Sequence, residues 1–322
     1  MKWLTLTALL LLVLAGCQEK KQAAVYAQSS PEPRGGLVVI HQSEPNAPGG
    51  NDTTIDTNAP REIGSRQMTL FDVTSQLPEG EGALRYVSAF AVPSERGAFL
   101  FLETEDSQLH RAWALVAQDP FPRLAELTAA LGLAQNNGWY SETHGLPMNF
   151  GGQIRVDYAG GETIRISDNQ SPVLDRQAGE QIAALFGELM AGEQVALPKP
   201  EDLTGIRFEE VREGGDFTRA ELTLLPDGTA VNQKTSKYGD SVYESEKPVE
   251  AETVNALREN LNATGLLAWS GLPDNGFRLD GEKKLTFLFS DGSQVEVEND
   301  RLLPGQLSMG FFNVELEMST KH

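Results

Sequence analysis

The sequence has very little cysteine and histidine. Cys17 is the single cysteine among 322 residues, so the rest of the chain has no thiol for a disulfide, a zinc site or a nucleophile. The four histidines, His41, His110, His144 and His322, are widely dispersed, and none has the close spacing of a zinc motif. We therefore expect no metal and no cofactor, and a fold stabilised by its hydrophobic core alone.

Basic residues are also scarce. Lysine and arginine total 26 against 46 aspartates and glutamates, which gives a formal net charge of −20. Nucleic acids are bound through basic surfaces, so this balance argues against a nucleic-acid partner. It also argues against docking on anionic lipid headgroups. The acidic surface favours solubility, a cationic partner, or divalent cations that bridge carboxylates.

Recognisable catalytic motifs are absent from the sequence. It contains no Gly-x-Ser-x-Gly and no glycine-rich nucleotide loop. Carboxylates are abundant, but groups such as Glu296, Glu298 and Asp300 alternate along a strand-like segment, as on a solvated edge. We predict no catalytic residue and favour a non-enzymatic protein.

One long apolar run is present, and it lies at the start of the chain. It extends from Leu4 to Ala15 behind Lys2, which is shorter than the roughly 20 residues needed to span a bilayer. The run ends in Leu14-Ala15-Gly16-Cys17, which resembles the lipobox of bacterial lipoproteins. The resemblance implies that residues 1–16 are a cleaved signal peptide. It also implies that Cys17 carries a diacylglycerol on its sulfur and a further acyl chain on its amine.

Residues 17–66 read as the lipidated cysteine followed by a flexible tether. Proline and glycine recur along this stretch, and such a composition buries too little apolar surface to offset its ordering entropy. A coil of this length reaches on the order of 40 Å. Gln18 is not the aspartate associated with inner-membrane retention in many lipoproteins, so the resemblance favours the outer membrane, facing the periplasm. Inner-membrane and surface-exposed locations stay open.

A short β-prone run, Leu37-Val38-Val39-Ile40, interrupts this tether. Its branched side chains favour a strand. Two interpretations remain open for it: an additional strand at the edge of the globular part, or a docking strand for a partner.

The globular part contains one hairpin pattern twice. Residues 153–158 and 162–166 alternate apolar and polar around Gly160-Gly161, and residues 284–289 and 293–297 do so around Asp291-Gly292. Alternation with a period of two around a glycine turn is typical of a β-hairpin. The apolar positions of the two hairpins are related by a constant spacing of 131 residues.

Helix-like segments flank both hairpins. Residues 122–131 and 249–261 precede them, and residues 176–190 and 306–318 follow them. With strand-like runs ahead of each first helix, each unit reads βββαββα. Hairpins beside helices, without strict βαβ alternation, favour an α+β fold with antiparallel sheets.

We therefore predict an α+β fold of two tandem related domains. Each is an antiparallel sheet with helices packed on one face. The boundaries are residues 67–195 and residues 206–322, joined by a linker at residues 196–205 that contains Pro198 and Pro200.

Two aromatic loops are the candidate binding residues. Trp139, Tyr140 and His144 belong to the first loop, and Trp269 and Asn275 to the second. Tryptophan and tyrosine are enriched in binding surfaces because they bury a large area at low entropic cost. The alternative is that both tryptophans fill the core between sheet and helices.

These observations together predict a lipid-anchored lipoprotein of the cell envelope. Its paired domains would act as a periplasm-facing protein-binding or assembly module, with an envelope protein as partner and the membrane bound only through lipid. One alternative is an envelope hydrolase that uses carboxylates. Another is a ligand-binding or inhibitor protein that uses the loops of Trp139 and Trp269.

Overall fold

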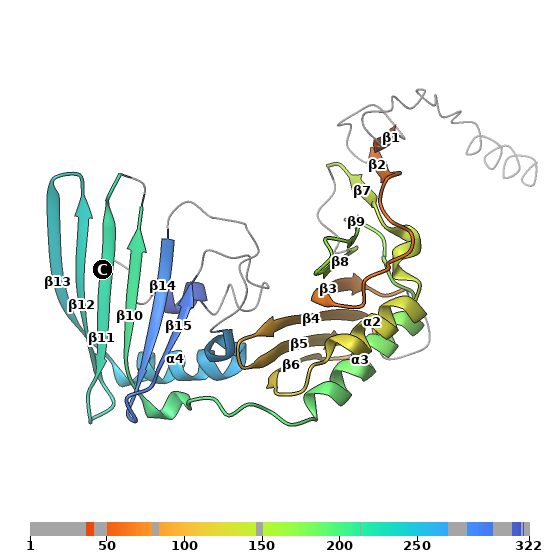
Figure 1. Cartoon of the computed structure of the whole chain (residues 1–322). Coiled ribbons are helices and arrows are strands. Elements are labelled where there is room, and N and C mark those ends of the chain that lie inside the picture. Colours follow the sequence, from red (N-terminus) through yellow and green to blue (C-terminus); the bar gives the residue numbers. More distant parts are fainter. Residues whose placement is uncertain are drawn as a thin grey trace, which may run out of the picture.

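The computed structural model describes residues 37–41, 50–78, 84–145, 151–212, 214–269, 282–298, 311–316 and 318. The predicted signal peptide and lipidation site, Cys17, and the candidate binding residue Asn275 lie outside these ranges. Within them the chain forms two β-sheets, one of nine strands and one of six (Figure 1). No helix in these ranges is long and apolar enough to cross a membrane.

The nine-stranded sheet has the order β1-β2-β7-β9-β8-β3-β4-β5-β6. All neighbours are antiparallel except β7 and β9, which are parallel. Its strands are β1 (Leu37–His41), β2 (Asn51–Asp56), β3 (Met68–Gln76), β4 (Tyr86–Ser94), β5 (Gly97–Glu105), β6 (Leu109–Val116), β7 (Trp139–Thr143), β8 (Gly152–Tyr158) and β9 (Thr163–Asp168).

The six-stranded sheet is antiparallel throughout and has the order β13-β12-β11-β10-β14-β15. Its strands are β10 (Leu203–Val211), β11 (Phe217–Leu224), β12 (Ala230–Tyr238), β13 (Ser241–Val249), β14 (Glu282–Phe289) and β15 (Gln294–Glu298).

Helices connect and accompany the strands. They are α2 (Phe121–Ala130), α3 (Arg176–Met190), α4 (Ala251–Thr264) and the short 3₁₀ helices η1 (Leu133–Asn136), η2 (Pro200–Asp202) and η3 (Leu266–Trp269), and residues 311–316 and 318 are also helical. The Asp175 carboxylate starts α3 by accepting a hydrogen bond from the backbone nitrogen of Ala178. Figure 1 shows α2 and α3 side by side along β3 to β6.

Both predicted hairpins are present. They are β8–β9 and β14–β15, and Gly161 and Gly292 adopt positive φ in their turns. The ten apolar positions that alternate in the sequence are all buried: Ile154, Val156, Tyr158, Ile164, Ile166, Leu285, Phe287, Phe289, Val295 and Val297. Period-two alternation therefore identified the inward face of each hairpin.

The predicted α+β class with βββαββα units is wrong. The described residues are mostly β, with 46% strand and 25% helix. Each unit has four strands, not three, before its first helix, and their spatial orders correspond: β9-β8-β3-β4-β5-β6 and β15-β14-β10-β11-β12-β13. The first sheet also extends beyond its unit through β7, β2 and β1.

The missed strands have physical reasons for their weak signals. The pairing of β3, which the sequence analysis missed, with β8 shifts register between Met68 and Leu70. Strand β10, whose residues 206–210 did read as strand-like, has a shift at the equivalent place in its pairing with β14, between Leu203 and Gly205. Such a bulge interrupts the alternation on which strand prediction depends. Strand β13 is an edge strand exposed along most of its length, so neither of its faces has an apolar pattern.

The two bulges lie at equivalent places, and the pairs beyond them also correspond. In each unit the first strand pairs with the first strand of the hairpin in the same register. The corresponding pairs are Phe71 with Val156 and Ile206 with Phe287, and then Val73 with Ile154 and Phe208 with Leu285.

Part of the predicted tether belongs to the first sheet. Strand β1 pairs with β2, and β2 pairs with β7, so both strands extend the sheet although they precede residue 67. The β-prone run 37–40 is an edge strand in this structure, the first of the two interpretations that the sequence allowed.

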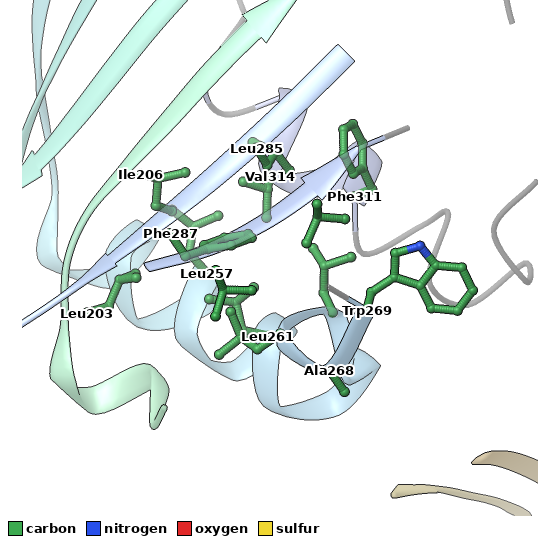
Figure 2. Close-up of a cluster of buried hydrophobic side chains, with 14 of the residues drawn as sticks. Leu203, Ile206, Leu257, Leu261, Ala268, Trp269, Leu285, Phe287, Phe311 and Val314 are labelled. Carbon is green, nitrogen blue, oxygen red and sulfur yellow. The ribbon is translucent and has the colours of Figure 1, made fainter. Parts of the chain in front are cut away.

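The two units share one hydrophobic core at their junction. Phe90 and Phe99, on the face of β4 and β5 turned away from α3, pack against the Trp269 ring with centroids 6.0 and 5.5 Å apart. Trp113 Nε1 donates a hydrogen bond to the Asn262 carbonyl oxygen at 2.9 Å. Figure 2 shows the Trp269 ring projecting from η3, away from the other labelled core residues.

Glycine is required at position 265 in this junction. Gly265 ends α4 with φ +69°, a conformation that favours glycine. A Cβ atom there would lie 2.5 Å from the Trp113 ring, well inside van der Waals contact. The turn after α4 therefore depends on both the conformation and the small size of this residue.

Candidate binding surface

An exposed tryptophan lies where the nine-stranded sheet extends beyond its core. Trp139 begins β7 and is 44% exposed. Its register neighbours are Ile55 on β2 and Ile166 on β9, and residues in register share one face of a sheet. Ile166 is buried in the core. The apolar row therefore continues from the core through Ile166 to Trp139 and Ile55, where solvent begins to reach it.

The backbone that leads into Trp139 is held firmly. The buried Asn137 side chain donates from Nδ2 to the carbonyl oxygens of Pro60 and Thr163, at 2.9 and 2.7 Å. Its Oδ1 accepts from the backbone nitrogen of Arg165 at 2.7 Å. Because the amide oxygen and both amide hydrogens are used locally, Trp139 is presented from ordered structure.

The opposite face of β7 is polar and acidic. His144, which follows the strand, has Nε2 2.9 Å from Asp52 Oδ2 and Nδ1 3.8 Å from Glu142 Oε1. Burial raises the pKa of Tyr140, an effect that the Arg165 charge opposes and the Asp56 charge supports. Strand β7 thus separates an apolar face from an acidic one.

The structure describes four of the five sequence-predicted binding residues, and it places the two tryptophans in different surroundings. Trp139, Tyr140 and His144 belong to one segment, on and beside a strand instead of in a loop, but Trp139 lies on the opposite face of β7 from Tyr140 and His144. Trp269 is only 5% exposed and belongs to the junction between the units. Asn275 lies outside the described residues, so its place relative to Trp269 stays a prediction.

A charged cluster that the sequence analysis missed lies on the same polar face. Arg155 and Arg165 each form an ion pair with Asp157, at 3.1 and 2.6 Å. Asp72 on β3 is in register with Arg155. Burial raises the pKa of Asp72 to about 6, although the charges of Arg155 and Arg165 act to lower it. In the sequence Asp72 lies between Phe71 and Val73, but only the strand and its register with Arg155 distinguish it from other aspartates.

A cavity of about 730 Å³ lies between residues 61–66 and α2, within the size range of ligand sites. The Arg61 guanidinium donates to the carbonyl oxygens of Gln135 and Asn137 at one end of this segment. The Glu162 carboxylate accepts from the backbone nitrogens of Gly64 and Ser65 at the other.

A second cavity of about 520 Å³ shares Arg66 and Pro122 with the first. The residues that line the two cavities do not include Trp139, Trp269, Asp72 or Asp157. Neither cavity therefore connects the aromatic residues or the charged cluster with an enclosed site.

Metal binding has no support within the described ranges, which contain no group of three histidine, cysteine, aspartate or glutamate residues arranged to hold an ion. No protein-family model matches the chain, and no curated protein matches it.

Proposed function

We propose that the protein is a lipid-anchored protein-binding module of the cell envelope. Its N-terminal lipid holds it to the membrane, and the surface around Trp139 binds an envelope protein partner. The single observation that carries the binding role is the exposure of Trp139 at the start of an ordered strand. The anchoring role follows from the resemblance of residues 14–17 to a lipobox.

A tryptophan held in this way is well suited to an interface. Its indole ring has a large area and few rotatable bonds, so burying it costs little conformational entropy. The ring extends an apolar row that already continues into the core through Ile166. A partner that covers Trp139 would continue this core outward, without moving any element of the sheet.

Replacing Trp139 with alanine tests this proposal. Truncating a tryptophan hot spot costs about 2 kcal/mol or more, which corresponds to about a 30-fold loss of affinity. We expect crosslinking in intact cells, followed by pull-down of the full-length W139A variant, to lose a partner that the natural protein recovers.

Leu109→Ala is the matched control. Leu109 is also an exposed apolar residue, at 49%, but it lies on β6 at the other end of the same sheet. L109A should retain the partner. Recovery of the same proteins by W139A, L109A and the natural chain would refute the role of Trp139.

A further inference from the structure

The four outer strands of the two sheets differ in how they are protected. Edge strands expose unpaired backbone groups, and proteins usually guard them with charge, proline or covering segments. On β6, Val116 bridges to Gln194, and the backbone nitrogen of Val195 donates to the Leu115 carbonyl oxygen. This end of the nine-stranded sheet is therefore partly covered.

Both edges of the six-stranded sheet are guarded by their sequences. Strand β13 contains Glu244, Glu246, Lys247 and Pro248, and β15 contains two further glutamates. Charges of this kind and proline all disfavour the addition of another strand. Neither edge is suited to pairing with a second chain.

Strand β1 lacks the charged residues and the proline that guard the edges of the six-stranded sheet. Its sequence, Leu37-Val38-Val39-Ile40-His41, contains no acidic residue, lysine, arginine or proline. It is the last strand on its side of the sheet, and within the described ranges it pairs only with β2. This edge therefore offers a template for an added strand. It lies at the same end of the sheet as Trp139, with only β2 between β1 and β7.

Charge near this edge indicates what the added strand would contain. Asp56 on β2 and Glu142 on β7 lie on the acidic face, whereas Ile55 and Trp139 lie on the apolar one. Side chains of a strand alternate between the two faces. A strand that alternates basic and apolar residues, added beside β1, would place its basic side chains on the face where β2 carries Asp52 and Asp56, one strand inward of β1.

A second copy of this chain is a poor occupant by the same reasoning. Each copy has a net charge of −20, so pairing through β1 would bring two acidic molecules together. The negative charge that repels a second copy attracts a partner whose strand presents lysine or arginine on one face.

We propose that the partner docks by adding an extended strand along β1, and that this strand alternates basic and apolar residues. The inference rests on the proposed protein-binding function and specifies its mode. Main-chain hydrogen bonds to β1 provide affinity, while the alternating side chains provide specificity.

Synthetic peptides test the mode directly. The probe is a peptide of about six residues, the length of an average strand, that alternates valine and lysine. Added to the full-length protein in detergent, it should slow amide hydrogen exchange in residues 37–41. A valine–glutamate peptide of equal length should bind at least tenfold more weakly. Equal protection by both peptides, or by neither, would overturn the proposal.

Two neighbouring proline substitutions provide an independent test. In an antiparallel pair, backbone N–H groups point alternately toward the partner strand and away from it. Of Val38→Pro and Val39→Pro, therefore, only one removes an outward N–H, and this variant should lose the valine–lysine peptide without a change in Tm. The other should weaken the pairing of β1 with β2. Glu246→Pro, on the β13 edge, should leave peptide binding unchanged.

The outcomes separate this inference from the function on which it rests. If W139A loses the cellular partner while both β1 proline variants still bind that partner fully, strand addition is refuted and the protein-binding function stands. Retention of the partner by W139A would count against the function itself. A doubling of molecular mass that either β1 proline abolishes would identify a second copy as the occupant and overturn the basic-strand proposal.

Discussion

At the scale of the residue, Asp72 gives the sharpest electrostatic prediction. Its pKa is about 6 in the folded chain, against an ordinary value of 3.8, because burial outweighs the attraction of Arg155 and Arg165. The folded state therefore holds the proton more tightly than the unfolded state does. The stability this provides is fully present below pH 3.8 and is lost as the pH rises through about 6.

Asp72→Asn should remove this loss. Relative to the natural protein, its free energy of unfolding should increase as the pH rises from 4 to 7. The increase should not exceed about 3 kcal/mol, since each unit of pKa shift corresponds to about 1.4 kcal/mol. Thermal unfolding across this pH range measures the difference, and a difference that does not vary with pH would contradict the assignment.

Asp157→Asn is the matched control on the same face. Asp157 forms ion pairs with both Arg155 and Arg165, so the substitution removes two attractive contacts. We expect D157N to unfold at a lower temperature than the natural protein at pH 7, where D72N unfolds at a higher one. Each substitution removes one negative charge from this face, but the two should change the unfolding temperature at pH 7 in opposite directions.

At the scale of the element, the junction between the units depends on η3. Trp269 packs against Phe90 and Phe99 across the junction. Truncating a buried aromatic residue lowers the free energy of unfolding by about 3–5 kcal/mol, and we expect a loss of this size here. Trp269→Ala should therefore lower Tm and separate the unfolding of the two sheets into two calorimetric transitions. Trp139→Ala, at an exposed position, should change the free energy of unfolding by only about 0.5 kcal/mol.

The elements that could be predicted are those whose local pattern survives intact. The hairpins β8–β9 and β14–β15 combine strict alternation with a glycine turn, and both cues are local. Strand β3 was missed because the bulge at Met68 and Leu70 breaks its alternation. Strand β13 was missed because, as an edge strand, it lacks a buried face. The residues of β1 read as β-prone, but the pairing of β1 with β2 and of β2 with β7 consists of long-range contacts, which leave little trace in composition.

The candidate site was predictable only in part, for a related reason. Aromatic content singled out both Trp139 and Trp269, but exposure depends on what the fold places over each ring. The sheet extends past its core at Trp139, whereas the other unit covers Trp269. Asp72 required knowledge of its strand and of its register with Arg155, which no local pattern provides.

At the scale of the whole molecule, the predicted anchor and the proposed docking edge lie in different segments of the chain. The strand that offers the open edge, β1, is separated from the predicted lipid at Cys17 by residues 18–36. Among the described strands, β1 is the nearest in sequence to the predicted lipid. We expect the interaction to favour partners that are themselves membrane-bound, because tethering two molecules to one surface raises their effective concentration.

The proposed lipid at Cys17 should be the sole hold on the membrane itself. With a net charge of −20, the protein has no electrostatic attraction to anionic headgroups, and two or three acyl chains at about 0.8 kcal/mol per buried CH₂ suffice for stable attachment. Cys17→Ser should therefore move the protein from the membrane to the soluble fraction at low and high salt alike. Combining C17S with W139A identifies any residual hold: C17S protein that stays with membranes and is released by W139A is held by its partner, whereas retention in both variants would refute the lipid anchor.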